Sequence, residues 1–433
     1  MKKTTLLLLA TLCAFLLSGC SLMLEDPSTL IFPPAKDPDQ YVERRLINLV
    51  LTNDEHLQVP DEMEDPAAYI RVDVNGDGKN EKLVFWSKNN GYEVGALIMQ
   101  ESSDGNWEVL DQVHQYGSAI DYFKMVDVDG DGTREACMGV NIGGYNVLYI
   151  YKLSEDGFTP VEQIDYSQLN IVESSEDDKD NIILTALNDI NATTPTTTVY
   201  AYLCNKNLEQ IYKEKFDGNC VELKFGEVGK NKKGLYVVRS SDYTNFNVDL
   251  LLPSKEKGFE DQLTERIYSV DASGDYNAII EDVTGDGILD VQSMLRPIDS
   301  TKRDSGDFIK IWKSWDGKDK LSNVYGILEN NTDGYIYVLP TYSLSTVRYQ
   351  FITEKSNSQV RFFDGNAEEP AVILYTHTAS SAERLKKKEG LISLGSSPSQ
   401  QRVYYALRNS DEFAGHKISD NTIKEAFQIE GGS

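Results

Sequence analysis

Positive charge is scarce in this chain of 433 residues. Lysine and arginine number 42 against 69 aspartates and glutamates, which gives a formal net charge of −27 at pH 7. A surface with this balance repels polyanions, so nucleic acid and anionic lipid headgroups are excluded as partners of the folded part. Proline is also infrequent, at 13 residues beside 31 glycines and 24 tyrosines, and this composition favours strands joined by turns.

Histidine and catalytic motifs are almost absent. The four histidines, His56, His114, His377 and His416, show neither HExxH nor HxH spacing. The sequence also lacks a GxSxG elbow, a Walker loop and a dinucleotide fingerprint in a suitable strand-to-helix context. We therefore predict no catalytic residue. Paired acids that converge from different parts of the chain remain an alternative, because sequence alone cannot show such convergence.

The single long apolar run lies at the N-terminus. Met1-Lys2-Lys3 is followed by the apolar stretch Leu6–Leu17 and by Leu17-Ser18-Gly19-Cys20. The stretch is too short for a helix that crosses a bilayer, which needs about 20 residues. The segment resembles a bacterial lipoprotein signal with its lipobox. The resemblance implies cleavage before Cys20, acyl chains such as palmitate on Cys20, and anchoring at the extracytoplasmic side of the cell membrane. An ordinary secretory peptide or an uncleaved anchor is the alternative.

Cysteine is too scarce for a disulfide framework. Cys13 lies in the expected signal and Cys20 is the expected lipid site, which leaves Cys137, Cys204 and Cys220. An odd number cannot all pair within one chain. Free buried thiols are the favoured interpretation, and a bridge between Cys204 and Cys220 is the alternative in an exported protein.

A nine-residue acidic pattern occurs three times. Each copy has oxygen-bearing side chains at positions 1, 3, 5 and 9 and glycines at positions 4 and 6. The copies are Asp73–Glu81 (DVNGDGKNE), Asp127–Glu135 (DVDGDGTRE) and Asp282–Asp290 (DVTGDGILD). A tight turn of this kind can aim side chains 1, 3 and 5 inward, while the carbonyl of position 7 and the acid at position 9 complete an oxygen shell for Ca²⁺.

The pattern therefore predicts two to three structural Ca²⁺ sites. The predicted ligands are Asp73, Asn75, Asp77, Lys79 and Glu81 in the first loop, Asp127, Asp129, Asp131, Thr133 and Glu135 in the second, and Asp282, Thr284, Asp286, Ile288 and Asp290 in the third. Lys79, Thr133 and Ile288 would contribute backbone carbonyls. We expect the second loop, with the most carboxylates, to bind most tightly, followed by the first and the third. Metal-free turns are the alternative, since Asp, Asn and Gly favour turns in any case.

The segments beside the loops determine the expected fold. An EF-hand needs Glu at position 12, where this chain has Val84, Met138 and Ser293, and the flanking segments are strand-like. A strand, acidic loop, strand unit resembles the FG-GAP and VCBS repeats of integrin-like β-propellers. Asp73 and Asp127 lie 54 residues apart, and Asp127 and Asp282 lie 155 apart, close to three such periods. The resemblance implies a mainly β protein, a propeller of about five blades, with the segment before Asp73 available to complete the last blade.

The C-terminal hundred residues differ in character. Four strand candidates follow residue 331, then a helix ended by Gly390, a further strand and a final helix with Ser419 as N-cap. This mixture predicts a small α+β domain, an antiparallel sheet with helices on one face. If these residues join the ring instead, the propeller has six or seven blades.

The expected organisation has five parts. They are a signal peptide at 1–19, a tether at 20–37, an N-terminal helix and lead-in at 38–54, the calcium-loop propeller at 55–330, and the α+β domain at 331–433. The predicted function is a non-catalytic binding or scaffold module in the cell envelope, for an unknown protein or glycan and not for nucleic acid. The alternatives are a glycoside hydrolase or lyase that uses channel carboxylates, and an accessory subunit of a membrane sensor or transporter.

Overall fold

The chain folds into a succession of antiparallel sheets. A computed structural model describes residue 47 and residues 50–430, apart from 53, 75–76, 89–90, 104–105, 174–180, 243–245, 264–266, 269–279, 296, 299–308, 355–356, 386–387 and 400. The expected signal, Cys20, the tether and nearly all of the N-terminal helix lie outside these residues. No helix in the described part is long and apolar enough to cross a bilayer.

The second and third sheets are meanders in which each strand pairs with the next, and the first sheet is a meander from β2 to β5 with β1 also paired to β3. The first sheet comprises β1 (Glu55–Leu57), β2 (Tyr69–Val72), β3 (Glu81–Lys88), β4 (Glu93–Glu101) and β5 (Trp107–Tyr116). The second comprises β6 (Ala119–Val126), β7 (Glu135–Asn141), β8 (Asn146–Ser154) and β9 (Gly157–Tyr166). The third comprises β10 (Gln168–Val172), β11 (Asn181–Asn188), β12 (Thr196–Asn205) and β13 (Asn207–Asp217).

The next three sheets continue the series. The fourth comprises β14 (Asn219–Gly229), β15 (Lys232–Ser240), β16 (Phe246–Ser254), β17 (Gly258–Asp261) and β18 (Ile267–Tyr268). The fifth comprises β19 (Ile280–Glu281), β20 (Asp290–Leu295), β21 (Ile309–Trp315), β22 (Leu321–Asn330), β23 (Tyr335–Val338) and β31 (Phe427–Ile429). The sixth comprises β24 (Val347–Glu354), β25 (Asn357–Asp364), β26 (Val372–Thr378), β27 (Leu391–Ser397) and β28 (Arg402–Arg408).

A few short elements complete the described part. They are the 3-10 helix η2 (Thr341–Ser343), the helices α3 (Ala379–Leu385) and α4 (Asp420–Glu425), and the hairpin of β29 (Glu412–Phe413) and β30 (His416–Lys417). The chain is thus mainly β, as its composition predicts.

Each sheet packs face to face on the next. Separate apolar cores join the first sheet to the second, the second to the third, and so on to the sixth. The strands between two cores have apolar side chains on both faces. In β15, Leu235 and Val237 belong to the core shared with the third sheet, whereas Tyr236 and Val238 belong to the core shared with the fifth. Successive side chains on a strand point to opposite faces, so a continuous apolar run such as LYVV fits a doubly buried strand.

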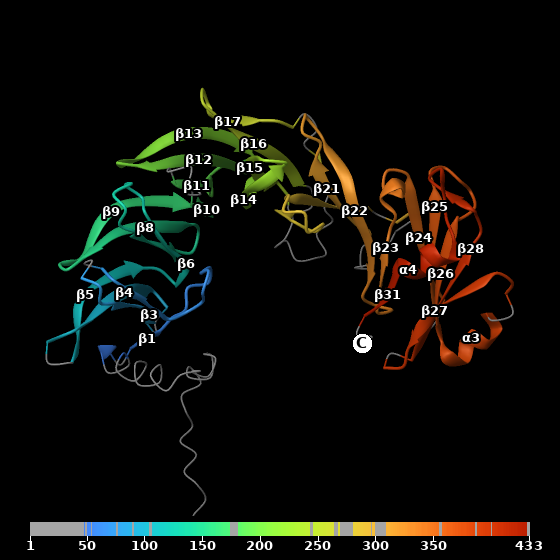
Figure 1. Cartoon of the computed structure of the whole chain (residues 1–433), viewed down its shortest axis with the longest axis horizontal. Helices are drawn as coiled ribbons and strands as arrows, with labels where there is room; N and C mark the ends of the chain where they lie inside the picture. Colours follow the sequence, from blue (N-terminus) through green and yellow to red (C-terminus); the bar gives the residue numbers. More distant parts are fainter. Residues whose placement is uncertain are drawn as a thin grey trace, which may run out of the picture.

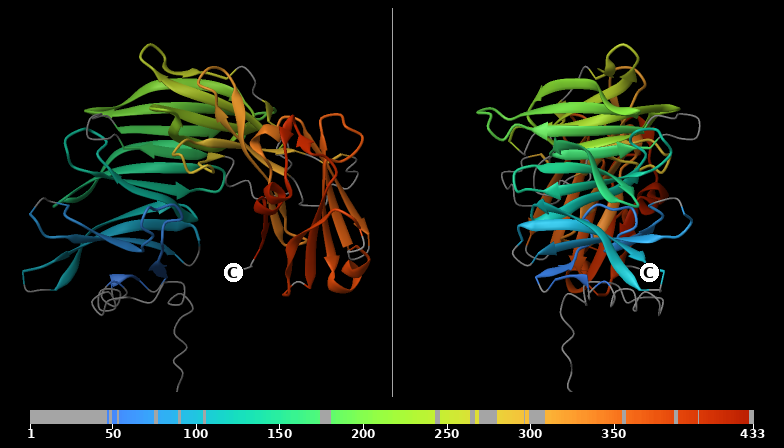
Figure 2. Two further views of the ribbon diagram at one scale, coloured as in Figure 1. Left: turned by 45° about the vertical axis from the view of Figure 1, so that its right-hand side comes forward. Right: turned by 90° about the vertical axis from the view of Figure 1, so that its left-hand side faces the viewer.

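The six sheets form an open arc. Figure 1 shows them side by side in chain order, with the first and the sixth sheet at separate ends, and Figure 2 shows the same stack from two further sides. Among the described residues no strand pair or apolar core joins these two sheets. Five sheets begin within 55–330, as the repeat spacing predicts, but they do not close into a ring.

The N-terminal segment does not complete the last blade. Its strands β1 and β2 both pair with β3 of the first sheet, and the fifth sheet is instead extended by β31 from the end of the chain. The outer face of the first sheet is covered locally. Ile47, the buried residue described from the expected helix, packs in one core with Trp86 and Leu97.

The C-terminal region differs from the small α+β domain expected at 331–433, which is not confirmed. Residue 331 falls in the tight turn between β22 and β23, which pair within the fifth sheet. The two helices also do not share one face, because Ile423 of α4 lies in the core between the fifth and sixth sheets while Leu385 of α3 packs on a separate cluster behind β26. Most of this region instead forms the sixth sheet of the same stack. Ser419 does cap α4, since its Oγ accepts the N–H of Thr422.

The three cysteines outside the N-terminal segment are free and buried. The interpretation as free thiols is therefore confirmed, and the alternative bridge between Cys204 and Cys220 is not present. Cys204 lies in the core between the second and third sheets, and Cys220 lies in the next core along the stack.

Candidate metal centre

The three acidic loops occupy equivalent places in three sheets. The first loop joins β2 to β3, the second joins β6 to β7, and the third joins β19 to β20. Each loop is therefore the turn between two neighbouring antiparallel strands of one sheet. The last acid of each loop is the first residue of the strand that follows. The strand, acidic loop, strand unit predicted from the sequence is confirmed.

The loops share one pattern of backbone hydrogen bonds. In all three, the carboxylate of position 1 accepts the N–H of position 6, at 2.9 Å from Gly78 to Asp73, 2.9 Å from Gly132 to Asp127 and 2.8 Å from Gly287 to Asp282. The carboxylate of position 5 accepts the N–H of position 7, at 2.8, 2.7 and 2.9 Å in the three loops. The acids at positions 1 and 5 thus hold the turn in shape themselves.

Glycine is required at position 6 for its backbone angle. Gly78, Gly132 and Gly287 have φ of 83°, 88° and 83°, a region that residues with a Cβ rarely adopt. An added Cβ at these glycines would meet no heavy atom within 4 Å, so the constraint is conformational and not steric crowding from neighbours.

The acid at position 9 is buried in every loop. Glu81 is 6% exposed, Glu135 is 1% exposed and Asp290 is 0% exposed. One oxygen of Glu135 accepts the N–H of Val128 at 2.8 Å, and one oxygen of Asp290 accepts the hydroxyl of Ser314. The other oxygens, Oε1 of Glu135 and Oδ2 of Asp290, are buried without a hydrogen-bond partner among the described residues. A buried carboxylate oxygen that lacks a donor is costly unless a cation meets it.

Burial also affects the acidity of these groups. It raises the pKa of Glu135 and the pKa of Asp290, against the opposing effect of the hydrogen bonds that each carboxylate accepts. At the exposed side of the second loop the pKa shift has the opposite direction. Lys152 donates to Asp131 and lowers the pKa of that carboxyl to about 2.

The second loop brings its predicted ligands closest together. Oxygen atoms of Asp127, Asp129 and Glu135 all lie within 4.8 Å of one another. In the third loop, position 3 is Thr284, so the carboxylate that Asp129 supplies in the second loop is missing there. In the first loop, Asn75 lies outside the described residues. The backbone N–H groups of Lys79, Thr133 and Ile288 donate to the position 5 acids, which places position 7 in the turn.

Two of the loops also contact a neighbouring sheet. The backbone N–H of Lys206 donates to the carbonyl of Asp129 at 2.7 Å, and the side-chain amide of Asn181 donates to the carbonyl of Asp127 at 2.9 Å, so the second loop is tied to the third sheet. Leu289 of the third loop donates to Glu227 of the fourth sheet at 2.7 Å. An ion that orders these loops would stabilise the junctions between sheets.

Lys152 contacts the second loop, and the loop motif did not reveal it. Its Nζ lies 2.5 Å from Oδ2 of Asp131 and 3.3 Å from Oδ2 of Asp129. The pairing of β7 with β8 could have indicated it. Ala136 lies opposite Tyr151, so the next two residues opposite each other are Glu135 and Lys152. By the same registers the equivalent neighbours of Glu81 and Asp290 are Gln100 and Ser314. The second loop therefore carries an internal cation where the other two loops have neutral side chains.

Replacing Lys152 by glutamine is expected to strengthen Ca²⁺ binding at the second loop. The ammonium occupies carboxylate oxygens that the ion needs, and the substitution reproduces the neutral Gln100 of the first sheet. Removal of one partly exposed competing charge predicts a gain of roughly two- to five-fold in affinity. Calorimetric titration of the variant and the parent measures it, with Gln100→Lys as the matched opposite change at the first loop. Unchanged affinity at the second loop would show that Lys152 does not compete.

A second titratable group lies at the opposite end of the second sheet. Asp121 is in β6, where the register to β7 shifts. Its carboxylate accepts the hydroxyl of Tyr166 at 2.8 and 2.9 Å and the side-chain amide of Asn146 at 2.6 Å. Burial raises the pKa of Asp121 to about 6 in spite of the bond from Tyr166, and the nearby acids Glu62 and Asp61 add to the rise. Burial also raises the pKa of Glu62.

These shifts predict a pH dependence of stability. A carboxyl whose pKa is higher in the folded than in the unfolded state binds more protons when folded, so the free energy of unfolding falls as pH rises from about 4 to about 7. For Asp121 the loss should be of the order of 1–2 kcal/mol once solvent screening is allowed for. Urea unfolding at pH 4.5 and 7 measures it. In Asp121→Asn the decline should shrink to the part that Glu62, Glu135 and Asp290 contribute, and an equal decline in both proteins would contradict the assignment.

Comparisons with known proteins give little further information. No protein-family model matches the chain, and no curated protein matches it. Among solved structures, one match is described as "Crystal structure of BBS1N in complex with ARL6DN, soaked with lead", with 8% sequence identity, 82% of this chain and 95% of that chain covered, and a TM-score of 0.27. A likeness of this degree carries no conclusion, so the chemistry of the loops rests on the chain's own residues.

Proposed function

We propose that the three acidic loops bind Ca²⁺ and that the ions stabilise the stack of sheets. The observation that carries this proposal is the pair of buried, unpartnered oxygens of Glu135 and Asp290, each at the same position of a loop with the same hydrogen-bond pattern. The donor set is entirely oxygen, which suits a hard cation. The holding residues would be the acids at positions 1, 5 and 9, the side chain at position 3 and the carbonyl at position 7.

The open arc is best interpreted as a propeller-like scaffold. Its repeated unit of about four antiparallel strands, stacked face to face on the next unit, has the form of a propeller blade. We propose that the lipobox cysteine Cys20 anchors this scaffold at the extracytoplasmic side of the membrane, and that it serves as a non-catalytic binding module for a protein or glycan. The long acidic chain would be held away from an anionic bilayer by its own charge.

The anchor can be tested in a bacterial host that exports and acylates lipoproteins. The full chain should incorporate a palmitate analogue and sediment with membranes, whereas Cys20→Ala should lose the label and accumulate as unprocessed precursor. Cys13→Ala is the matched control, because this cysteine lies within the segment that would be removed, and it should keep the label. Equal labelling of the Cys20 variant would exclude Cys20 as the lipid site.

A hydrolase or lyase is the second candidate, and the raised pKa of Asp121 is the observation that favours it. A carboxyl whose pKa is raised to about 6 can act as a general acid in mildly acidic solution, and Glu62 lies near enough to influence it. Turnover of a glycan panel that is lost in Asp121→Asn but kept in Asp127→Asn would favour this enzyme over a binding module.

A further inference from the structure

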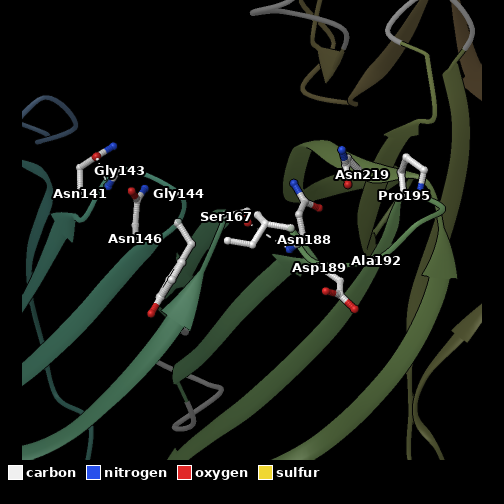
Figure 3. A pocket seen from close by; sticks show the side chains of 12 residues that line it. Asn141, Gly143, Gly144, Asn146, Ser167, Asn188, Asp189, Ala192, Pro195 and Asn219 are labelled. Atoms are coloured by element: carbon white, nitrogen blue, oxygen red, sulfur yellow. Dashed lines mark hydrogen bonds between the residues drawn. The ribbon is translucent and has the colours of Figure 1, made fainter.

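A polar pocket lies on the face of the arc opposite the metal loops. It has a volume of about 470 Å³ and is formed where the second, third and fourth sheets meet. The β7–β8 turn, the loop after β11 and the start of β14 contribute its walls, and Figure 3 shows the lining side chains along these elements. The acidic loops lie at the other ends of β6, β7 and β11, since Asn181 contacts the second loop while Asn188 lines the pocket.

The pocket lining consists mainly of neutral groups that both donate and accept hydrogen bonds. Its polar side chains are Asn141, Asn146, Asn188, Asn219, Ser167, Tyr145 and Asp189, and none of the lining residues is Lys, Arg or His. A site for an anion would need a cation in its wall, and the net charge of the chain repels anions as well. Carboxamides match hydroxyl groups, because each of them offers a donor and an acceptor side by side.

Several of these amides are fixed in orientation by the fold. Asn146 donates through Nδ2 to Asp121 at 2.6 Å, which leaves its Oδ1 as an acceptor without a bond to any described residue. Asn141 accepts through Oδ1 from Gly143 at 3.0 Å and from Ser118 at 3.2 Å, which leaves its Nδ2 as a donor. Asn188 instead bridges both backbone groups of Cys220 and forms a rigid wall. The free donor and acceptor are therefore pre-oriented.

Exposed aromatic and aliphatic side chains continue the same face. Tyr92 and Tyr116 are 63% and 69% exposed, and their rings stack 6.3 Å apart at an interplanar angle of 12°. Ser118, two residues after Tyr116, bonds to the backbone and side chain of Asn141, which joins the tyrosine pair to the pocket. Ile190 at the pocket itself is 62% exposed. Large side chains this exposed are a feature of binding surfaces.

We propose that this surface, from Tyr92 and Tyr116 across the pocket to Asn219, binds a neutral oligosaccharide. The tyrosine rings would stack on the apolar faces of sugar rings, and Asn141, Asn146 and Ser167 would bond to hydroxyl groups of a ring within the pocket. The volume is suited to one or two sugar units, and the tyrosine pair provides an adjacent subsite. This inference rests on the proposed role as a binding module and is independent of Ca²⁺.

Affinity electrophoresis of the full chain in detergent tests the proposal. Native gels containing mannan, xylan, dextran or hydroxyethylcellulose are compared with gels containing the anionic polymer polygalacturonate. We expect retardation by at least one neutral polymer and none by polygalacturonate. Tyr92→Ala/Tyr116→Ala and Asn141→Ala should each weaken the retardation at least ten-fold. Val161→Ala, which truncates another exposed side chain in β9, is the matched control and should retain it.

The outcomes separate this inference from the proposed function. Absence of retardation by all four neutral polymers, retardation by polygalacturonate alone, or full retardation of the double tyrosine variant would overturn the oligosaccharide site. In each case the Ca²⁺-dependent rise in melting temperature is measured on the same samples. If that rise is intact, only the oligosaccharide site fails. If it is absent as well, the calcium scaffold fails with it.

Discussion

Replacing Arg239 by methionine is expected to lower the free energy of unfolding by about 3–5 kcal/mol. Nε and Nη2 of Arg239 in β15 each lie 2.6 Å from Oδ2 of Asp249 in β16, and the side chains are 6% and 0% exposed. Nη1 also donates to the carbonyl of Asp217, and the guanidinium lies over the ring of Phe216. The substitution would leave the carboxylate of Asp249 buried without its counter-charge.

Urea unfolding of matched variants measures this effect. Lys257→Met removes one member of an exposed ion pair with Glu260, at 3.0 Å and with side chains 65% and 52% exposed, and such a pair contributes less than about 1 kcal/mol. The double change Arg239→Met/Asp249→Leu should recover much of the loss, because it removes the buried charge as well. A loss in Arg239→Met no larger than that in Lys257→Met would show that the buried pair contributes nothing to stability.

Removal of Ca²⁺ is expected to have the second large effect. An ion held at one hundred times its dissociation constant stabilises the folded state by about 2.7 kcal/mol per site. Asp127→Asn should lose this contribution at the second loop, while its carboxamide can still accept one of the backbone N–H groups that now donate to Asp127. In calorimetric melting with Ca²⁺, the variant should therefore have a clearly lower melting temperature than the parent. With chelator, the two melting temperatures should be close.

The matched control is Asp156→Asn, an exposed acid in the β8–β9 turn outside the loops, which should respond to Ca²⁺ as the parent does. If Asp127→Asn lost the same stability with Ca²⁺ and with chelator, the carboxylate would act only as a cap of the turn. If the parent melted at the same temperature in both conditions, the loops would be metal-free turns.

Local features of the fold were predictable from the sequence, because each depends on a few adjacent residues. The DxDGDG pattern located turns that the backbone of Gly132 and its equivalents confirms. In the candidate site, the presence of an acid at position 9 was given by the same pattern, whereas its burial was not. The cap at Ser419 was likewise readable from spacing alone.

Long-range features were not predictable, for identifiable reasons. The pairing of β31 with β23 joins segments some ninety residues apart in a strand too short to give a periodic signal. The strand β27 was missed because Gly395 interrupts it at a register shift. Whether the sheets close into a ring depends on the small angle between each sheet and the next, and no single residue determines that angle. Lys152 was missed because it does not lie in the second loop or in the strands β6 and β7 that the loop joins. It lies in the next strand, β8.

The most direct test is a calorimetric titration of the metal-stripped full chain with Ca²⁺. Three acidic loops with a common geometry predict saturable binding of three ions per chain, which should fall to two in Asp127→Asn and likewise to two in Asp282→Asn. Absence of saturable binding, or an unchanged number of bound ions in both variants, would contradict the assignment of these loops as calcium sites.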